Sequence, residues 1–227
     1  RRLMVRAAVA PSKPKTVQFP TAIEKTEEDE HARPEFEERE YKNTLNPKRA
    51  FDACQKIMSS RIKSQDSYFK LSCHPNSSIN VAGINSVLET WERDSGWVPD
   101  VVVIDYADIL APMHPGSNAE TRDQVNATWK ALRSLSQSRH CLVVTATQAN
   151  ASSYHAHTVD QSSFSEDKRK FAHVTGMVGL NTTPVEKELG VMRLNWVVLR
   201  EDDFAVTRCV HVAGCLALGQ PAVRSTF

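Results

Sequence analysis

The sequence predicts an α/β fold with a mainly parallel sheet and an antiparallel extension at its carboxyl-terminal end. Two apolar runs, residues 101–104 and 140–147, have the length and β-branched composition of buried strands. Segments with helical periodicity alternate with these runs, and such alternation favours right-handed crossovers and parallel pairing. Two further runs, residues 192–199 and 209–218, read as long strands that favour the antiparallel extension.

The amino-terminal part differs from the rest in composition. Residues 1–10 have a helical composition without a preceding cap, which predicts the end of a truncated core helix. Residues 11–47 combine prolines with an acidic stretch, which predicts a solvated insertion or linker with short helical pieces. Residues 48–227 are then expected to form the core.

The first part of the core reads as helix, strand, helix, strand. Apolar residues recur at helical spacing over residues 48–63 and over residues 84–91. Between them, residues 67–73 alternate as a short strand. Gly96 and Pro99 end the second helix ahead of the strand over residues 101–104.

Two polar residues, Asp105 and Gln148, end the two central strands. A helix predicted over residues 121–138 connects these strands, and its inner face carries Trp129. Because parallel strands end at the same edge of a sheet, Asp105 and Gln148 are expected to emerge together at the edge where open α/β sheets bind ligands.

Loops are predicted on either side of the second central strand. Residues 111–118 contain two prolines and a glycine, and residues 149–165 are polar without a clear period, which predicts a mobile loop at the same edge. The basic cluster Lys168, Arg169 and Lys170 follows. A strand over residues 174–180 and a short helix over residues 184–189 precede the long carboxyl-terminal strands.

Asp105 has the placement of a Walker B aspartate, which holds the Mg²⁺ of a bound nucleoside triphosphate. Many core strands also end in aspartate, so a capping role or a buried ion pair is the alternative. Asp108 could assist the metal or cap the loop, and capping is the commoner role for a loop aspartate.

Composition limits the class of protein. The chain has 227 residues, 41% of them hydrophobic, which allows one sizeable core. Its 28 basic and 27 acidic side chains nearly cancel, so any contact with nucleic acid must come from a local patch. Five cysteines without a CxxC pair predict free thiols in a reducing compartment. No apolar run approaches the ~18 residues that span a bilayer, which predicts no membrane contact and a cytoplasmic location in a bacterial or phage-infected cell.

Four short matches, in order and with matching spacing, resemble the RecA-like ATPase core of DnaB-type replicative helicases, particularly phage-encoded forms. They are Val103-Ile104-Asp105-Tyr106, Trp129-Lys130-Ala131-Leu132, Thr147-Gln148, and Met192-Arg193-Leu194 through Leu199-Arg200. The resemblance covers roughly residues 98–227, and residues 1–10 less fully. It implies a RecA-like three-layer fold, and a ring, expected to be a hexamer, that uses ATP and Mg²⁺ to move along single-stranded DNA.

The resemblance also implies residue roles. Asp105 would organise Mg²⁺, and Gln148 would sense the γ-phosphate and pass its state to an adjacent DNA-binding loop. Arg200 matches an arginine finger that reaches into the neighbouring subunit's site. Loops over residues 107–121 and 149–170, with Lys168, Arg169 and Lys170, would hold DNA. For that basic cluster a short solvated face is an equally common explanation.

The chain departs from the family pattern in several places. It contains no Gly-x-x-x-x-Gly-Lys-[Ser/Thr], because none of its 8 glycines precedes a lysine. The family's catalytic glutamate would precede Arg1-Arg2-Leu3. We therefore expect a missing amino-terminal portion and no ATP turnover by these residues alone. Val198 and Glu201-Asp202-Asp203 stand where the family often has a lysine and a glycine turn, so a surface salt bridge is the alternative role of Arg200.

Two other functions fit the same residues. One is a degenerate, non-catalytic RecA-fold module that acts as a partner or loader, and the other is a recombinase that forms DNA filaments. His155 and His157 lack neighbouring ligands at metal-binding spacing, and Trp91 and Trp129 have the helical spacing of core residues. These four residues therefore predict neither a metal site nor a base-stacking platform.

Overall fold

The structure of the chain is a computed structural model that describes residues 10–11, 15–29, 31–42, 45–61, 69–114, 116, 120–150, 157–164 and 168–227. The helix predicted over residues 1–10 lies almost wholly outside this set. The chain divides into two compact units. Unit 1 comprises the described parts of residues 1–68, 157–159 and 178–227, and unit 2 those of residues 69–156 and 160–177.

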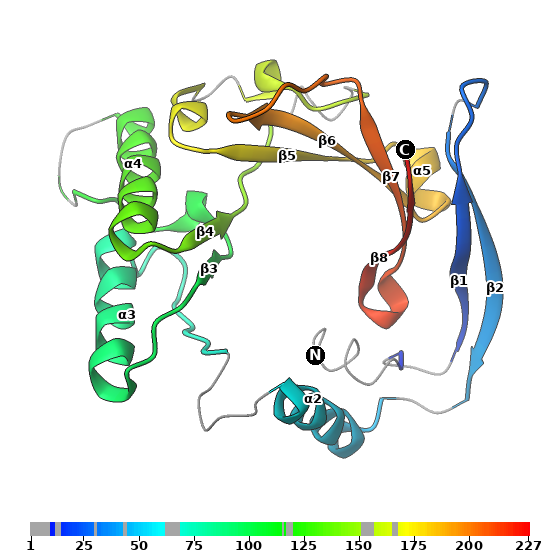
Figure 1. Cartoon of the computed structure of the whole chain (residues 1–227), viewed down its shortest axis with the longest axis horizontal. Helices are drawn as coiled ribbons and strands as arrows, with labels where there is room; N and C mark the ends of the chain where they lie inside the picture. The colour runs from blue at the N-terminus through cyan, green and yellow to red at the C-terminus, as the bar shows by residue number, and fades with distance from the viewer. Residues whose placement is uncertain are drawn as a thin grey trace. The chain divides into compact units, whose positions relative to one another are not determined.

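Unit 2 is built on two parallel strands with helices on one face. β3 (Val101–Ile104) pairs in parallel with β4 (Leu142–Thr145). Helices α3 (Val81–Ser95) and α4 (Thr121–Arg139) pack beside these strands, as Figure 1 shows in cyan and green. The predicted strand–helix alternation and the parallel pairing of the two central strands are therefore confirmed.

The core of unit 2 lies between the helices and one face of the strands. The buried members of this core are Val81, Leu88, Ala107, Trp129, Leu132 and Leu135. Val102, Ile104 and Val143 pack against them from the strands. Trp129 is 4% exposed, which confirms its interpretation as a core residue.

The prediction that the two central strands are buried on both faces is wrong. On the face opposite the helices, the strand side chains are exposed by 49% at Val101, 73% at Val103, 57% at Leu142 and 43% at Val144. Apolar runs in parallel sheets normally reflect cover on both faces. In the described residues this sheet has only two strands, and its helical cover lies on one side, so an apolar run alone does not establish burial here.

The helix ends follow local rules. Asn80 caps α3, because its side chain accepts a hydrogen bond from the Gly83 amide, and Gly96 ends the helix with φ 67°. α3 therefore contains the predicted segment 84–91 and stops at the predicted glycine. In contrast, residues 69–73 are irregular, so the strand predicted over residues 67–73 is wrong in its described part.

Unit 1 begins with an antiparallel hairpin. β1 (Lys15–Glu24) pairs with β2 (Arg33–Tyr41), with a register shift between Pro20 and Ala22. The short helical pieces predicted within residues 11–47 are therefore wrong. Charged residues conceal an alternation in β1 that buries Val17 and Ile23 against the rest of the unit, while the acidic side chains of β2 remain largely exposed.

A four-stranded sheet forms the rest of unit 1. Its order is β5 (Gly176–Asn181), β6 (Val191–Leu199), β7 (Cys209–Cys215) and β8 (Gln220–Thr226), of which β5 begins in unit 2. β6 pairs antiparallel with β7, and β7 with β8. The antiparallel extension is confirmed, but the strand predicted over residues 209–218 is two strands joined by a 3-10 turn at Leu216–Leu218.

The expectation of a mainly parallel sheet needs the same correction. Parallel pairing in the described chain is confined to β3 and β4, and β5 joins the antiparallel strands instead. The remaining helices of unit 1 match the predicted segments closely: α2 is Pro47–Arg61 and α5 is Pro184–Glu188.

The hairpin packs on the sheet through two small apolar clusters. Ile23 and Ala32 meet Val191 and Ala213, and Val17 meets Cys215 and Leu218. Figure 1 shows the hairpin in blue beside β8 in red. β1 contacts both β7 and β8, which makes residues 15–41 an integral layer of unit 1.

Two predictions about the whole chain can be compared with the structure. All five cysteines are free thiols, as predicted, and Cys141 and Cys215 are buried. Within the described ranges, none of the helices combines the length and the hydropathy that a membrane crossing requires.

Candidate functional site

Unit 2 brings together the two polar residues that were predicted to share a sheet edge. β3 and β4 run in parallel with Ile104 opposite Thr145, so the residues that follow both strands lie at the same edge. Gln148 Nε2 donates to the hydroxyl of Tyr106 at 3.4 Å, next to Asp105. The Asp105 side chain is exposed at this edge. A carboxylate and an amide therefore face solvent side by side.

Asp108 binds the loop that carries Gln148. Its Oδ2 accepts hydrogen bonds from Thr147 Oγ1 at 2.6 Å and from the Gln148 backbone amide at 3.3 Å. Its Oδ1 accepts from Lys170 Nζ at 3.1 Å. A carboxylate engaged by three donors organises the loop, and it leaves Asp105 as the available carboxylate of the edge.

The basic cluster lies on the 3-10 turn η4 (Lys168–Ala172) and its members have different surroundings. Lys168 is exposed. Arg169 Nη1 contacts Asp123 Oδ1 at 2.8 Å, with both side chains about half exposed, and such surface pairs are weak. Lys170 turns inward, and its side chain is only 12% exposed. DNA contact by these three residues stays a prediction.

Arg200 lies in unit 1, directly after β6, and is exposed. Its predicted role as a finger concerns a neighbouring subunit and stays a prediction. The same strand carries a second arginine, Arg193, which is buried and 2% exposed.

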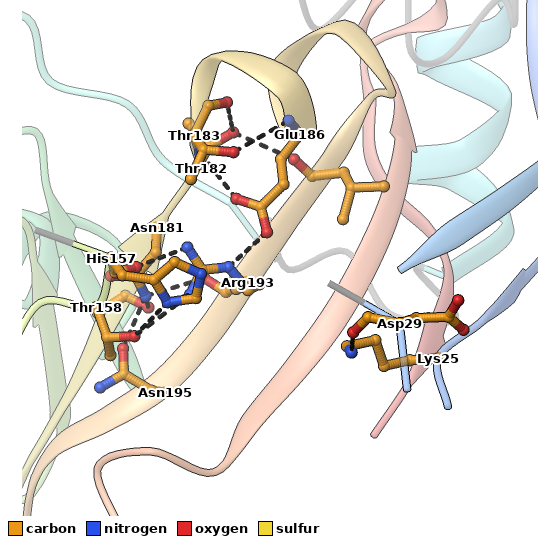
Figure 2. A network of polar contacts seen from close by, with 12 residues as sticks. Lys25, Asp29, His157, Thr158, Asn181, Thr182, Thr183, Glu186, Arg193 and Asn195 are labelled. Carbon is orange, nitrogen blue, oxygen red and sulfur yellow. Dashed lines mark hydrogen bonds and ion pairs between the residues drawn. The ribbon is translucent and has the colours of Figure 1, made fainter. Parts of the chain in front are cut away.

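Arg193 is the centre of a buried polar network that the sequence alone did not predict (Figure 2). Its Nε contacts Glu186 Oε1 at 2.5 Å, and their side chains are 3% and 1% exposed. Its Nη2 donates to the His157 carbonyl at 2.6 Å, and its Nη1 donates to His157 Nδ1 at 3.0 Å and to Thr158 Oγ1 at 3.3 Å. The guanidinium therefore has partners on each of its nitrogens.

Glu186 is ionised in this network. Burial by itself would raise the pKa of Glu186, but hydrogen bonds from Arg193 and from the Thr183 amide, together with attraction to the guanidinium, hold the pKa below its usual value. Thr183 and Glu186 form a capping box at α5, and Pro184 occupies the first turn. The Thr-Pro-x-Glu sequence was the available local signal for this part of the network.

Two buried asparagines hold the neighbouring backbone of Val159. Asn181 Oδ1 accepts from the Val159 amide at 2.6 Å, and Asn195 Nδ2 donates to the Val159 carbonyl at 3.0 Å. Asn181 Nδ2 also donates to Asn195 Oδ1 at 2.8 Å. Gly179 makes this arrangement possible, because a Cβ at that position would lie 2.5 Å from Asn195 Oδ1. The network thus fixes residues 157–159 on β5 and β6.

His211 on β7 lies opposite Arg193 in the register, and its Nδ1 is buried without a hydrogen-bond partner in the described chain. Burial lowers the pKa of His211, and the positive charges of Arg193, Lys25 and His157 add to this effect against the opposing charge of Glu186. The folded protein therefore holds His211 neutral.

Acidification is expected to weaken unit 1 through His211. The pKa of His211 is lower in the folded than in the unfolded protein, so below about pH 6.5 only the unfolded state takes up this proton. The free energy of unfolding should fall between pH 7.5 and 5.5, with a slope of at most about 1.4 kcal/mol per pH unit from this residue. Urea unfolding at both values measures this fall. The variant His211→Gln should lose it, and an unchanged slope in that variant would assign the dependence to other groups.

The edge that carries Asp105 was also compared with the needs of a divalent cation. In the described residues no group of three or more His, Cys, Asp or Glu side chains has metal-binding proximity. Mg²⁺ bound with a nucleotide commonly takes one or two carboxylates and completes its shell with phosphate oxygens and water. One exposed carboxylate, Asp105, fits that use and does not fit a metal held by protein alone.

Similarity to known proteins is found among solved structures. No protein-family model and no curated protein sequence matches the chain. A solved structure described as a helicase-type "ATPase Domain" matches with a TM-score of 0.67 and 13% identity, over 96% of this chain and 67% of that one. A structure titled "The Structure Of A DnaB-Like Replicative Helicase And Its Interactions With Primase" matches with a TM-score of 0.69 and 14% identity. That match covers 98% of this chain and 47% of the helicase chain, so this chain spans about half its length.

At these identities the likeness concerns the fold. The chain has the mixed α/β fold seen in ATPase domains of DnaB-like helicases. Likeness of fold alone leaves the chemistry to be argued from the site.

Proposed function

We propose that this chain is part of an ATP-dependent replicative DNA helicase that couples ATP hydrolysis to movement along single-stranded DNA. The observation that carries the proposal is the shared edge of β3 and β4, where Asp105 and Gln148 follow adjacent parallel strands and Gln148 contacts Tyr106 at 3.4 Å. Ligands of open α/β sheets bind at this edge. The similarity to helicase ATPase domains supports the same assignment.

In this proposal each residue of the edge has one role. Asp105 would hold the Mg²⁺ of bound ATP, and the ion would supply positive charge to the transferring phosphoryl group. Gln148 presents an amide that can donate to a phosphate oxygen while its backbone stays bound to Asp108. Arg200 would act on the nucleotide of the next subunit in a ring, expected to be a hexamer.

The 227 residues contain no phosphate-binding loop with its lysine. The proposal therefore assigns ATP turnover to the full-length gene product and DNA contact to the loops on either side of β4. A degenerate partner or loader module is the second candidate, and the missing Gly-Lys motif is the observation that favours it. A protein of that kind would neither hydrolyse ATP nor respond to DNA.

Replacement of Gln148 tests the proposal. In the full-length protein, Gln148→Ala is expected to lower Mg²⁺-dependent ATP turnover about 10- to 100-fold and to abolish its stimulation by single-stranded DNA, because the amide that reports the phosphate is removed. Turnover is measured with and without single-stranded DNA. Gln18→Ala, on the hairpin of unit 1, is the control and should behave as the unmodified protein. Retention of full DNA stimulation by Gln148→Ala would contradict the sensor role.

A further inference from the structure

A closed set of contacts joins the basic turn η4 to the edge that carries Gln148. Lys170 Nζ donates to Asp108 Oδ1 at 3.1 Å and to Thr147 Oγ1 at 2.9 Å. Thr147 Oγ1 in turn donates to Asp108 Oδ2 at 2.6 Å. The three side chains come from segments 23 and 62 residues from Lys170 along the chain, so only folding brings them together.

The surroundings of Lys170 differ from those of a lysine that waits for a phosphate. Its side chain is 12% exposed and that of Asp108 is 22% exposed. The Lys170 ammonium also lies 5.6 Å from the ring centre of Trp129, a member of the unit 2 core. Charge-assisted hydrogen bonds in such partly buried surroundings hold a side chain in one position.

Asp108 connects Lys170 to the sensor residue. The carboxylate that Lys170 neutralises also accepts the backbone amide of Gln148 at 3.3 Å. Loss of the ammonium would leave the Asp108 carboxylate free to rotate toward water and would release that amide. The position of the Gln148 side chain therefore depends on Lys170 through one intervening residue.

We propose that Lys170 is a positioning residue for Gln148 and that its ammonium, bound to Asp108 and Thr147, sets the catalytically competent position of the sensor loop. The assignment rests on the function proposed above for Gln148. It removes Lys170 from the residues expected to contact DNA phosphates and leaves that expectation to Lys168 and Arg169.

Kinetics of the full-length protein separate the two roles of Lys170. Lys170→Met is expected to lower the kcat of ATP turnover about 10-fold or more, because small misplacements of catalytic groups cost this much. The KM for ATP, the affinity for single-stranded DNA and the salt dependence of that affinity should stay unchanged. Lys170→Arg, which keeps the charge, should retain more activity than Lys170→Met. Lys130→Met, at an exposed lysine of α4, is the matched control.

The opposite pattern would overturn the proposal. A lysine that contacts a DNA phosphate would, when replaced, weaken DNA binding at all sequences and reduce the slope of log affinity against log salt by about 1. Weaker DNA binding of this kind with an unchanged kcat in Lys170→Met would identify a phosphate contact.

Hydrogen exchange provides a test that does not depend on turnover. The Gln148 amide should exchange faster in Lys170→Met and in Asp108→Asn, and the double variant should exchange no faster than either, because all three break one network. Unchanged exchange in both single variants would overturn the positioning role. A protein without ATP turnover that shows the expected exchange pattern would refute the proposed function and retain the contact network.

Discussion

Replacing Glu186 by glutamine is expected to destabilise the protein by about 3–5 kcal/mol, the largest stability effect of a single change in unit 1. Glu186 is 1% exposed and neutralises Arg193, which is 2% exposed. The amide can still accept a hydrogen bond from the guanidinium, but the arginine charge then lies in a low-dielectric interior without a counter-charge. Urea or thermal unfolding of the purified protein measures the loss.

Two variants control this result. Glu188→Gln, at an exposed position of the same helix, should change the free energy of unfolding by less than about 0.5 kcal/mol. The double variant Glu186→Leu with Arg193→Met should be more stable than Glu186→Gln, since replacement of both charges by apolar groups removes the unpaired charge. Equal stability of Glu186→Gln and Glu188→Gln would show that the pair contributes little.

The pH dependence of the Glu186 effect follows from its lowered pKa. The stability that ionised Glu186 contributes is present above the pKa of the unfolded glutamate, near 4.5, and disappears as the pH falls through the lower folded value. The difference between the unmodified protein and Glu186→Gln should therefore shrink only in the acid range, well below the range in which His211 acts.

Asp105→Asn is expected to have the largest effect on activity. In the full-length protein it should reduce Mg²⁺-dependent ATP turnover by about 10²-fold or more, because an amide oxygen carries no charge to hold the ion beside the phosphates. The side chain is exposed, so folding should be retained. Turnover measured over a range of Mg²⁺ concentrations, with thermal unfolding on the same sample, tests both parts.

The control for this variant lies on the same strand. Asp100 precedes β3, at the end opposite Asp105, and is also exposed. Asp100→Asn should leave turnover unchanged. Equal turnover by Asp105→Asn and the unmodified protein would remove Asp105 from the mechanism and would favour the non-catalytic alternative.

The edge of β3 and β4 could be predicted because its signals are local. An apolar run that ends in aspartate, a second run that ends in glutamine and a helix between them require parallel strands with a common edge. The prediction that Asp105 and Gln148 lie at one edge is confirmed by the register of β3 and β4. Their roles in ATP turnover stay predictions, because no contact in the chain tests them.

Residues 15–41 and residues 101–104 show where local signals were insufficient. Charge dominates the composition of the hairpin, and its strands form because Val17 and Ile23 find apolar partners that come from β6, β7 and the 3-10 turn after β7. The β3 run has the composition of a buried strand, yet Val103 is 73% exposed. Burial depends on which elements cover a face, and composition does not specify them.

The sequence by itself determined the helices with their caps, the parallel central strands and the placement of Asp105 and Gln148 at one edge, since each depends on neighbours a few residues apart or on the order of elements. Only the tertiary structure decided that Lys170 binds Asp108, 62 positions away, and that Arg193 holds His157, 36 positions away. Hydrogen bonds and ion pairs of this kind form between side chains that folding desolvates together, so the pairing of partners follows from the packing.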